Sequence, residues 1–457
     1  MRKLLVVLVL LVLVAGGVFV GSGRMAGPVV QIGSPEKFVG ASTALDVTIQ
    51  APGGRVSAVN VDFEQNGTTT RIFTSADAAA ATHLSPEGND RVRVTHSVGR
   101  DNIAGLTSGP ARIVVTASRP VLFGLRRVST QAVRDVQVRL ERPTVAVLST
   151  HHYINQGGAE MVVYRVSPTD VQSGVVVGDR EYPGYPASGA TVEGVKIVDP
   201  AVRVAFFALL YNQAPSTAMH LFARDDAGNT ARGDFDYRTF PKAPKKSTIP
   251  LDDKFLDRVV PAILAGTTEI KPEGSTIEKF LAINGDLRRK NAATIGAFAS
   301  QSAPELFWRG VVFHPFTNSA VESAFADQRT YLYQGKEVDH QTHLGFDLAS
   351  YANTPIVAAN RGKVLHAAEL GIYGNCVIID HGMGVQSLYA HLSQIGVKVG
   401  DMVDKDQPIG RSGITGLAGG DHLHFTMLVN GQMVNPVEWW DPHWIEDRIL
   451  RKLRTAQ

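Results

Sequence analysis

The sequence predicts a mainly β, multidomain protein that begins with a helix long enough to span a membrane. Three observations predict this fold class. A chain of 457 residues is too long for one ordinary core, so we expect two to four domains. Short alternating segments rich in β-branched residues, separated by Gly and Pro turns, fill most of the sequence. The N-terminal region differs from the rest, because it is uncharged and rich in Leu and Val.

The apolar N-terminal run extends from Leu4 to Gly23 and follows Arg2 and Lys3. Twenty helical residues span about 30 Å, roughly the thickness of the hydrocarbon core of a bilayer. Two cations before such a run favour a cytoplasmic N-terminus, with the rest of the chain on the opposite side. We therefore expect residues 1–23 to form a membrane anchor. The alternative is a cleaved signal peptide, because several small residues in the run suit a cleavage site.

Two β-sandwich modules of immunoglobulin-like type are predicted, over residues 24–142 and 143–240. Alternating segments such as Leu45–Ile49 recur there, and Gly-rich turns separate them. In the second module, the stretch from Leu221 to Ala231 resembles the last hairpin of bacterial immunoglobulin-like domains. The alternative is a generic hairpin with Gly and Asn at its turn.

Residues 241–300 are predicted to form a linker followed by helices. The stretch from Pro241 to Ser247 is rich in Pro and Lys, which is typical of a linker. Ser275 and Glu278 have the spacing of a capping box and precede apolar residues. We expect two helices between about residues 252 and 294.

The remaining sequence predicts a second β region and a final helix. Strand-like segments separated by Gly turns favour an antiparallel β domain over residues 301–441, and residues 442–457 favour a short amphipathic helix. Cys376 is the only cysteine, so no intrachain disulfide is possible, and its apolar neighbours indicate a core position. The 45 basic and 43 acidic residues leave a net charge of +2, which gives no support for a nucleic-acid partner.

Histidines gather in the C-terminal β region. Residues i and i+2 of a strand share a face and lie about 6–7 Å apart, so His422 and His424 would point into one space. That arrangement suits a metal site, although a pair of surface histidines on an edge strand is the alternative. His343 and Asp347 are also metal-ligand types, and the chain must bend between them to share an ion, most easily at Gly345.

These residues occur in a fixed order with other motifs. The order is His343-x-Gly-x-Asp347, a Gly-bounded strand from Gly374 to Gly382, Tyr389-Ala-His391-Leu392, and His422-Leu-His424-Phe425. It strongly resembles the catalytic domain of the lysostaphin-like (M23, or LytM-type) zinc peptidases. The resemblance covers about 95 residues, from His343 to Pro436. One departure is Thr426, where an acidic residue is common in the family.

The resemblance implies a role for each of the five residues. His343, Asp347 and His424 match the ligands of one Zn²⁺ ion, and His391 and His422 match the two catalytic histidines that do not bind it. Three protein ligands leave the fourth position of a tetrahedral zinc site open to water. Four other histidines fall outside the pattern and are expected to be structural: His314, His340, His366 and His381.

The resemblance also implies a function and a place. We expect a zinc metalloendopeptidase that hydrolyses peptide cross-links of peptidoglycan, at bonds between D-Ala and diaminopimelate. Its partners would be peptidoglycan, the bacterial inner membrane through the N-terminal helix, and an envelope regulator that the sequence does not identify. An uncleaved anchor predicts a single-pass inner-membrane protein with its bulk in the periplasm, and a cleaved one predicts secretion to the periplasm.

Two other functions are compatible with parts of the sequence. One is a non-catalytic LytM-type docking module that activates a cell-wall amidase, against which the complete set of five residues argues. The other is a periplasmic adaptor, because the stretch from Val397 to Val403 resembles the hairpins of lipoyl-like domains. Adaptors usually carry long coiled coils, and no sustained heptad pattern occurs here.

Overall fold

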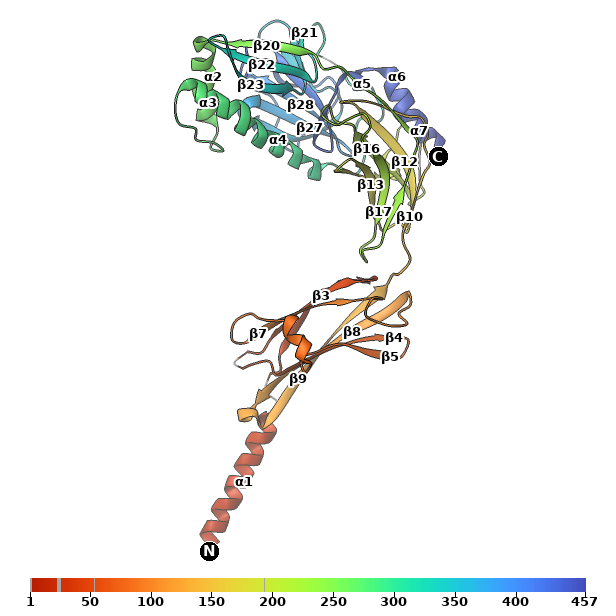
Figure 1. Cartoon of the computed structure of the whole chain (residues 1–457), viewed down its shortest axis with the longest axis vertical. Helices are drawn as coiled ribbons and strands as arrows, with labels where there is room; N and C mark the ends of the chain where they lie inside the picture. The colour runs from red at the N-terminus through yellow and green to blue at the C-terminus, as the bar shows by residue number, and fades with distance from the viewer. Residues whose placement is uncertain (1, 23–25, 53, 193, 315) are drawn as a thin grey trace. The chain divides into compact units, whose positions relative to one another are not determined.

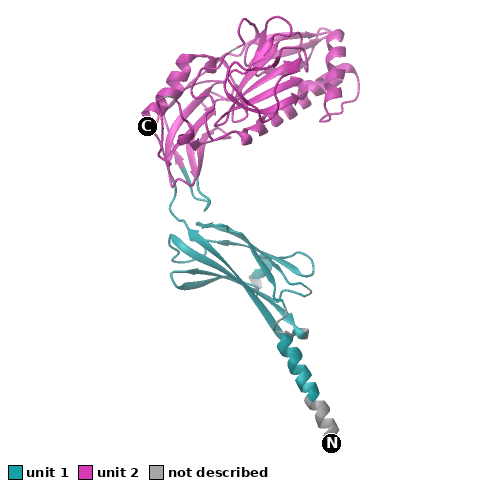
Figure 2. Cartoon of the chain, turned by 180° about the vertical axis from the view of Figure 1, so that it is seen from behind, with its two compact units in different colours: residues 1–143, 224–231 teal, residues 144–223, 232–457 magenta. Residues whose placement is uncertain are grey.

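The computed structural model describes residues 2–22, 26–52, 54–192, 194–314 and 316–457 (Figure 1). The described chain is mainly β with few helices, as the sequence predicts. It divides into two compact units, residues 1–143 with 224–231 and residues 144–223 with 232–457 (Figure 2). The finer domain limits predicted at residues 240, 300 and 441 lie inside the second unit and stay predictions.

Helix α1 (Arg2–Ser22) occupies the predicted N-terminal segment, whose end residues 1 and 23 lie outside the described residues. Within the part of the chain that the structure describes, no helix combines the length and the hydropathy needed to cross a membrane. The predicted transmembrane helix is therefore not confirmed. The membrane anchor and the cleaved signal peptide both stay predictions.

The first unit contains a sandwich of two sheets. One sheet has the order β1 (Val29–Ser34), β3 (Thr43–Gln50), β7 (Arg91–Val98) and β6 (Leu84–Pro86). The other has the order β2 (Phe38–Val39), β9 (Arg126–Val138), β8 (Gly109–Val121), β4 (Ala58–Gln65) and β5 (Thr68–Thr74). Buried residues of both sheets, such as Val47 and Val115, belong to one apolar core. The alternation seen in the sequence is thus that of sandwich strands, while the immunoglobulin-like type stays a prediction.

Further small sheets follow, and they belong to the second unit apart from residues 224–231. One sheet has the order β10 (Thr144–Val147), β12 (Ala159–Ser167), β16 (Val202–Ala208) and β15 (Tyr185–Pro186). A second has the order β14 (Arg180–Pro183), β13 (Gln172–Val177), β17 (Met219–Arg224) and β18 (Thr230–Gly233). The third pairs β11 (His152–Asn155) with β19 (Tyr237–Phe240). The predicted hairpin is present as β17 and β18. Its turn uses Gly228, whose φ of +87° lies in the region that favours glycine.

The predicted linker ends in a strand. Lys246 and Ser247 begin β20 (Lys246–Leu251), which pairs in parallel with β22 (Asp327–Tyr333). The composition of this stretch concealed the strand, because its backbone hydrogen bonds go to a partner far away in sequence. β23 (Lys336–His343) completes this three-stranded sheet.

The predicted helices follow β20. There are three α-helices where two were expected: α2 (Asp253–Gly266), α3 (Thr276–Ala282) and α4 (Arg288–Ala297). A π-helical turn over Ile283–Leu287 joins the last two. The capping box is confirmed, because Ser275 Oγ accepts from the Glu278 backbone N–H and the Glu278 side chain accepts from the Ser275 N–H. Such a cap contributes about 1 kcal/mol to a helix.

The C-terminal sheet carries most of the candidate residues. Its order is β21 (Ala320–Ser323), β24 (Phe346–Ala349), β32 (Leu423–Val429), β28 (Val385–Leu392), β27 (Asn375–Gly382), β26 (Gly362–Glu369) and β30 (Met402–Val403), with β33 (Gln432–Val434) beside β32. A smaller sheet has the order β25 (Pro355–Val357), β31 (Pro408–Arg411) and β29 (Gln394–Ile395). Helices α2 to α4 lie beside this sheet (Figure 1), and Phe280 shares a core with Ile378 and Leu388.

The chain ends in a helical run that contacts β11 and β12 within the same unit. The run comprises α5 (Val437–Trp440), α6 (Pro442–Ile445), a π-helical turn (Glu446–Leu450) and α7 (Arg451–Thr455). Lys452 Nζ lies 2.7 Å from Glu160 Oε1 of β12, and both side chains are buried. Glu438 accepts hydrogen bonds from Asn155 Nδ2 and the Ala159 N–H, each 2.8 Å long.

Candidate metal centre and active site

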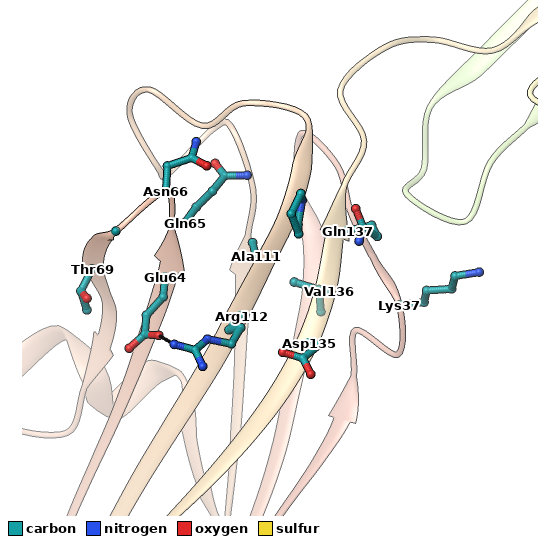
Figure 3. A pocket seen from close by; sticks show the side chains of 12 residues that line it. Lys37, Glu64, Gln65, Asn66, Thr69, Ala111, Arg112, Asp135, Val136 and Gln137 are labelled. Carbon is teal, nitrogen blue, oxygen red and sulfur yellow. Dashed lines mark hydrogen bonds and ion pairs between the residues drawn. The ribbon is translucent and has the colours of Figure 1, made fainter.

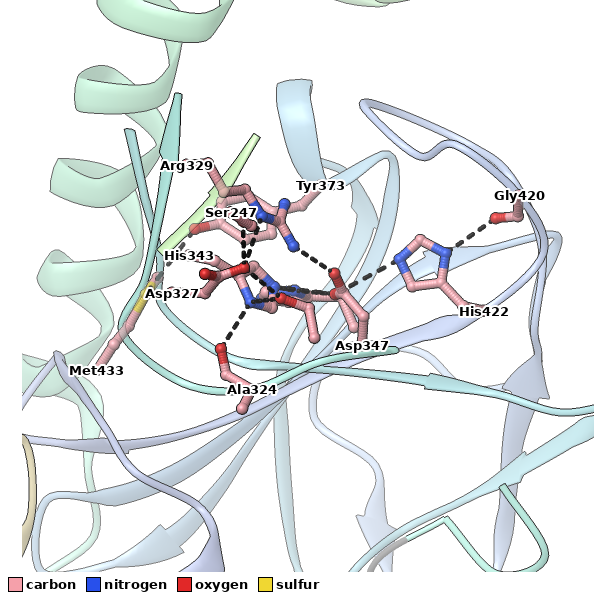
Figure 4. A network of polar contacts seen from close by, with 12 residues as sticks. Ser247, Ala324, Asp327, Arg329, His343, Asp347, Tyr373, Gly420, His422 and Met433 are labelled. Atoms are coloured by element: carbon pink, nitrogen blue, oxygen red, sulfur yellow. Dashed lines mark hydrogen bonds and ion pairs between the residues drawn. The ribbon is translucent and has the colours of Figure 1, made fainter. Parts of the chain in front are cut away.

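Two of the predicted ligands lie opposite each other on neighbouring strands. Asp347 of β24 and His424 of β32 are direct partners in the antiparallel pairing of these strands. Directly opposed residues point to the same face of a sheet. His343 is the last residue of β23, and the chain bends at Leu344 and Gly345 before β24 begins. The bend brings the His343 ring against Asp347 (Figure 4).

The three side chains are buried and converge on one small space. His343 Nε2 lies 2.9 Å from Asp347 Oδ1 and 3.0 Å from His424 Nδ1, and the latter two atoms are 3.0 Å apart. Three ligands each about 2.0–2.2 Å from one tetrahedral ion are spaced about 3–3.5 Å from one another. The triangle therefore fits a single zinc ion. Among the residues that the structure describes, it is the one group of His, Cys, Asp or Glu with this geometry.

Gly345 leaves room for the His424 ring. A Cβ atom at this position would lie 2.5 Å from His424 Cε1 and 2.9 Å from the Phe425 carbonyl oxygen. The sequence pointed to Gly345 because a bend is easiest at glycine. The structure gives a different reason, since the residue has no left-handed φ and is required for its small size.

Hydrogen bonds fix which ring nitrogen of each ligand faces the site. His343 Nδ1 lies 3.2 Å from the Ala324 carbonyl oxygen and 3.2 Å from Ser323 Oγ, so it carries the proton and leaves the Nε2 lone pair towards Asp347. His424 uses Nδ1 towards the same space, while its Nε2 is buried without a hydrogen-bond partner. Both rings thus present a nitrogen to one point.

The two predicted catalytic histidines flank the ligand triangle. His391 lies on β28, next to β32, and its ring centroid is 4.8 Å from that of His422 and 5.8 Å from that of His424. Its φ of +62° is unusual for a residue with a Cβ and turns the end of β28. His422 Nε2 lies 3.5 Å from Asp347 Oδ1. All five predicted residues are therefore brought together.

The same two histidines are held in one tautomer by backbone carbonyls. His391 Nδ1 donates to the Thr415 carbonyl oxygen at 2.8 Å, and His422 Nδ1 donates to the Gly420 carbonyl oxygen at 2.9 Å. Each ring consequently keeps Nε2 for chemistry.

Burial and neighbouring charges together shift the pKa values of the site residues. Burial raises the pKa of Asp347, but the neighbouring His343 outweighs burial and holds this pKa well below its usual range. Burial lowers the pKa of His424 to about 4, and burial with the neighbouring histidines also lowers that of His391. Burial lowers the pKa of His422 too, but its contact with Asp347 outweighs burial and raises this pKa overall.

The four histidines outside the motif have other partners. His381 is fully buried, and it contacts the Arg361 carbonyl oxygen and Ser387 Oγ. It lies on β27. The others contact groups away from the ligand triangle: His314 with Asp406, His340 with Thr330, and His366 with Ala368.

Sequence reasoning missed four residues around the ligands. Arg329, Asp327 and Ser323 precede the first motif, and Ser247 lies on β20 in the expected linker (Figure 4). Arg329 Nη2 donates to Asp347 Oδ2 at 2.8 Å. A single sequence carries no signal for them, because they reach the site through strand pairings and not through local spacing.

The first unit has a separate hollow of about 770 Å³ (Figure 3). It lies against β4, β8 and β9, and its lining includes the ion pair between Arg112 and Glu64. None of the five predicted residues lines it.

Comparison with known proteins points to the same region. Residues 341–436 match the model of peptidase family M23. Over 95 residues, 21% of this chain and 22% of the other, the chain is 43% identical to the DD-carboxypeptidase/endopeptidase Mpg of Neisseria meningitidis. It is 29% identical over 180 residues to the peptidoglycan DD-endopeptidase ShyA of Vibrio cholerae, 38% of this chain and 39% of that protein. The matched parts thus span well under two thirds of these relatives.

Part of the chain also aligns with a solved structure. The catalytic domain of the antimicrobial peptidase lysostaphin from Staphylococcus simulans aligns with a TM-score of 0.24 and 29% identity, over 27% of this chain and 92% of that domain. The matched family model spans all five predicted residues. Through residues 341–436, the chain carries a domain of peptidase family M23.

Proposed function

We propose that this protein is a zinc-dependent endopeptidase that hydrolyses the peptide cross-links of peptidoglycan. The observation that carries the proposal is the triangle of His343 Nε2, Asp347 Oδ1 and His424 Nδ1, with edges of 2.9–3.0 Å. Two imidazole nitrogens and one carboxylate oxygen are a common ligand set of catalytic zinc, which keeps one further position for water or substrate.

Zinc would be held by these three residues. When bound, it supplies Lewis acidity, which lowers the pKa of water and polarises a carbonyl group. The protein supplies a dry setting for this chemistry, because all three ligands and both flanking histidines are buried. Electrostatic interactions are stronger where water is excluded.

The proton transfers fall to His391 and His422. Their Nδ1 atoms are engaged by the carbonyl oxygens of Thr415 and Gly420, so Nε2 of each ring can accept or return a proton. Among the described residues, no helix carries an H-E-x-x-H motif, so no glutamate supplies the base in the way that this motif would. Peptide hydrolysis needs a proton removed from water and one delivered to the leaving amine, and two histidines are sufficient for both.

The substrate is proposed from the names of the relatives. Mpg is a DD-carboxypeptidase/endopeptidase and ShyA is a peptidoglycan DD-endopeptidase. Both names support a bond between two D-centres, such as the bond from D-Ala to diaminopimelate in a cross-link. The place of action that we propose is the periplasm, with residues 1–23 as an inner-membrane anchor, because the cations Arg2 and Lys3 precede the apolar run. An envelope regulator is a further proposed partner.

The test uses purified peptidoglycan and the zinc-loaded protein. Wild-type protein is expected to convert cross-linked muropeptides to monomers, and a metal chelator is expected to stop the reaction. His391→Ala is the matched inactive variant. Release of uncleaved stem peptides from the glycan, with the cross-links intact, would instead indicate an amidase, and a zinc-loaded protein that releases nothing would fit a non-catalytic activator. Either result would overturn the proposal.

A further inference from the structure

The two oxygens of the Asp347 carboxylate have different partners. Oδ1 faces His343 Nε2 and His424 Nδ1 at 2.9 and 3.0 Å, and Oδ2 accepts a 2.8 Å hydrogen bond from Arg329 Nη2. The guanidinium group is mostly buried, with 20% of the Arg329 side chain exposed, and so is the carboxylate. One oxygen is therefore available to a metal ion while the other is already engaged (Figure 4).

A second buried carboxylate lies beside the guanidinium group. Asp327 and Arg329 are two residues apart on β22 and hence share a face of the strand. Asp327 Oδ2 lies 3.7 Å from Arg329 Nε, a distance that allows an ion pair but not a hydrogen bond. With 2% of its surface exposed, Asp327 is fully inside the protein, where a carboxylate requires a partner.

Asp327 also reaches the other side of the ligand triangle. Its Oδ2 accepts from Ser323 Oγ at 3.2 Å, and Ser323 Oγ lies 3.2 Å from His343 Nδ1. Ser247 Oγ of β20 donates to the same Oδ2 atom at 2.7 Å. One buried carboxylate thus connects to His343 through Ser323 and to Asp347 through Arg329.

We propose that Arg329 is a positioning residue of the metal site, which holds the Asp347 carboxylate so that Oδ1 alone faces the metal. Asp327 in turn orients Arg329. This inference rests on the proposed zinc site, and it extends that site beyond residues 341–436, because Arg329 and Asp327 both precede the matched segment.

The chemistry of arginine explains why this residue type is present. A guanidinium group is planar and always charged, so Arg329 can donate to Asp347 at a fixed angle while its charge faces Asp327, whereas an ammonium group is a point charge on a flexible stem. Groups that bind the outer side of a metal ligand typically change metal affinity by about 10–100-fold when they are removed. Without Arg329, the carboxylate is free to rotate and to bind through either oxygen.

The experiment compares zinc affinity in the full chain for wild type, Arg329→Met and Arg329→Lys, by competition with a chromophoric chelator. The matched control is Arg361→Met, because Arg361 is an exposed arginine of the same domain that pairs with Asp404. We expect Arg329→Met to bind zinc about 10–100-fold more weakly, Arg329→Lys to be intermediate, and the control to equal wild type. The visible spectrum of bound Co²⁺, which depends on ligand geometry, should shift in Arg329→Met and not in the control.

The outcomes separate this inference from the function on which it rests. Wild-type affinity and an unchanged Co²⁺ spectrum in a folded Arg329→Met would overturn the role of Arg329 and leave the zinc site standing. A wild-type chain that binds no zinc would overturn the proposed function itself. If Arg329→Met does not fold, Arg329→Lys keeps the buried charge and decides the matter by the same two readouts.

Discussion

Asp347 and His424 are direct partners across the antiparallel strands β24 and β32, with Oδ1 and Nδ1 3.0 Å apart. The register of two strands therefore places two ligand atoms side by side, although the residues are 77 positions apart in sequence. A slip of one residue would turn one of the side chains to the other face of the sheet. The candidate metal site is in this sense a consequence of strand register.

The ligand assignment predicts the loss of both zinc and activity. His343→Ala or Asp347→Ala removes one of three ligand atoms, so zinc content measured by elemental analysis should fall from about one per chain towards zero. Hydrolysis of peptidoglycan should be lost as well. The matched control is His340→Ala, on the same strand, where the side chain is 68% exposed and should leave zinc content unchanged. A His343→Ala protein that retains one zinc would exclude this residue as a ligand.

The two flanking histidines predict a different pattern. His391→Ala and His422→Ala leave the ligand triangle complete, so zinc content should stay near that of wild type. The rate constant kcat should fall by about 10²–10⁴-fold, the usual contribution of a general acid or base. Steady-state cleavage of a cross-linked muropeptide measures this. Cleavage by His391→Ala at the wild-type rate would remove that residue from the mechanism.

Gly345→Ala tests the close packing at the bend. Its Cβ would meet His424 Cε1 at 2.5 Å, so the ring must move and the triangle must open. We expect weaker zinc binding, measured by chelator competition. Gly419→Ala is the control, because nothing lies within 4 Å of a Cβ at that position. Equal zinc affinity in the two variants would show that a Cβ atom at position 345 does not displace the His424 ring.

The candidate ligand triangle was predicted from the resemblance to the lysostaphin-like peptidases, whose motifs occur here in the same order. His424 lies on β32 and His422 directly precedes that strand, and His343 and Asp347 are separated by a short bend. Arg329 and Ser247 could not be predicted in this way. They reach the site through the pairing of β22 with β23 and with β20, and a single sequence does not specify which strands pair.

For the fold, too, local elements were predictable and long-range packing was not. Alternating residues indicated strands such as β3 and β8, and Ser275 with Glu278 marked the start of α3. The association of helices with the sheet was not predictable, because Phe280 is buried against residues about 100 positions later, such as Ile378. A fragment that begins at residue 300 would lack Phe280 and β20, and it is therefore a poor test of the catalytic domain.

Stability should depend on pH through Glu438. Burial raises the pKa of this carboxyl to about 7, despite its hydrogen bonds from Asn155 and Ala159, against 4.5 for an ordinary glutamate. A raised pKa means that the folded state binds the proton more tightly. The contribution of Glu438 to stability is thus fully present below about pH 4.5 and is lost as the pH rises towards and through 7.

The comparison of wild type with Glu438→Gln isolates this effect. We expect the Tm of wild type, relative to the variant, to fall between about pH 4.5 and 7 and to level off above that range. The control is Glu446→Gln, which removes the exposed partner of Arg454 and should change the curve little, since exposed ion pairs contribute about 0–1 kcal/mol. A constant difference across the whole range would contradict the shifted pKa.

X-ray absorption at the zinc edge of the purified wild-type protein tests the central claim most directly. The predicted result is one zinc per chain with two imidazole nitrogens and a carboxylate oxygen at about 2.0–2.2 Å. No sulfur should be seen, because Cys376 is buried in the apolar core with Ile378 and Leu388. A spectrum with fewer than two imidazoles, or a protein that retains no zinc, would contradict the account.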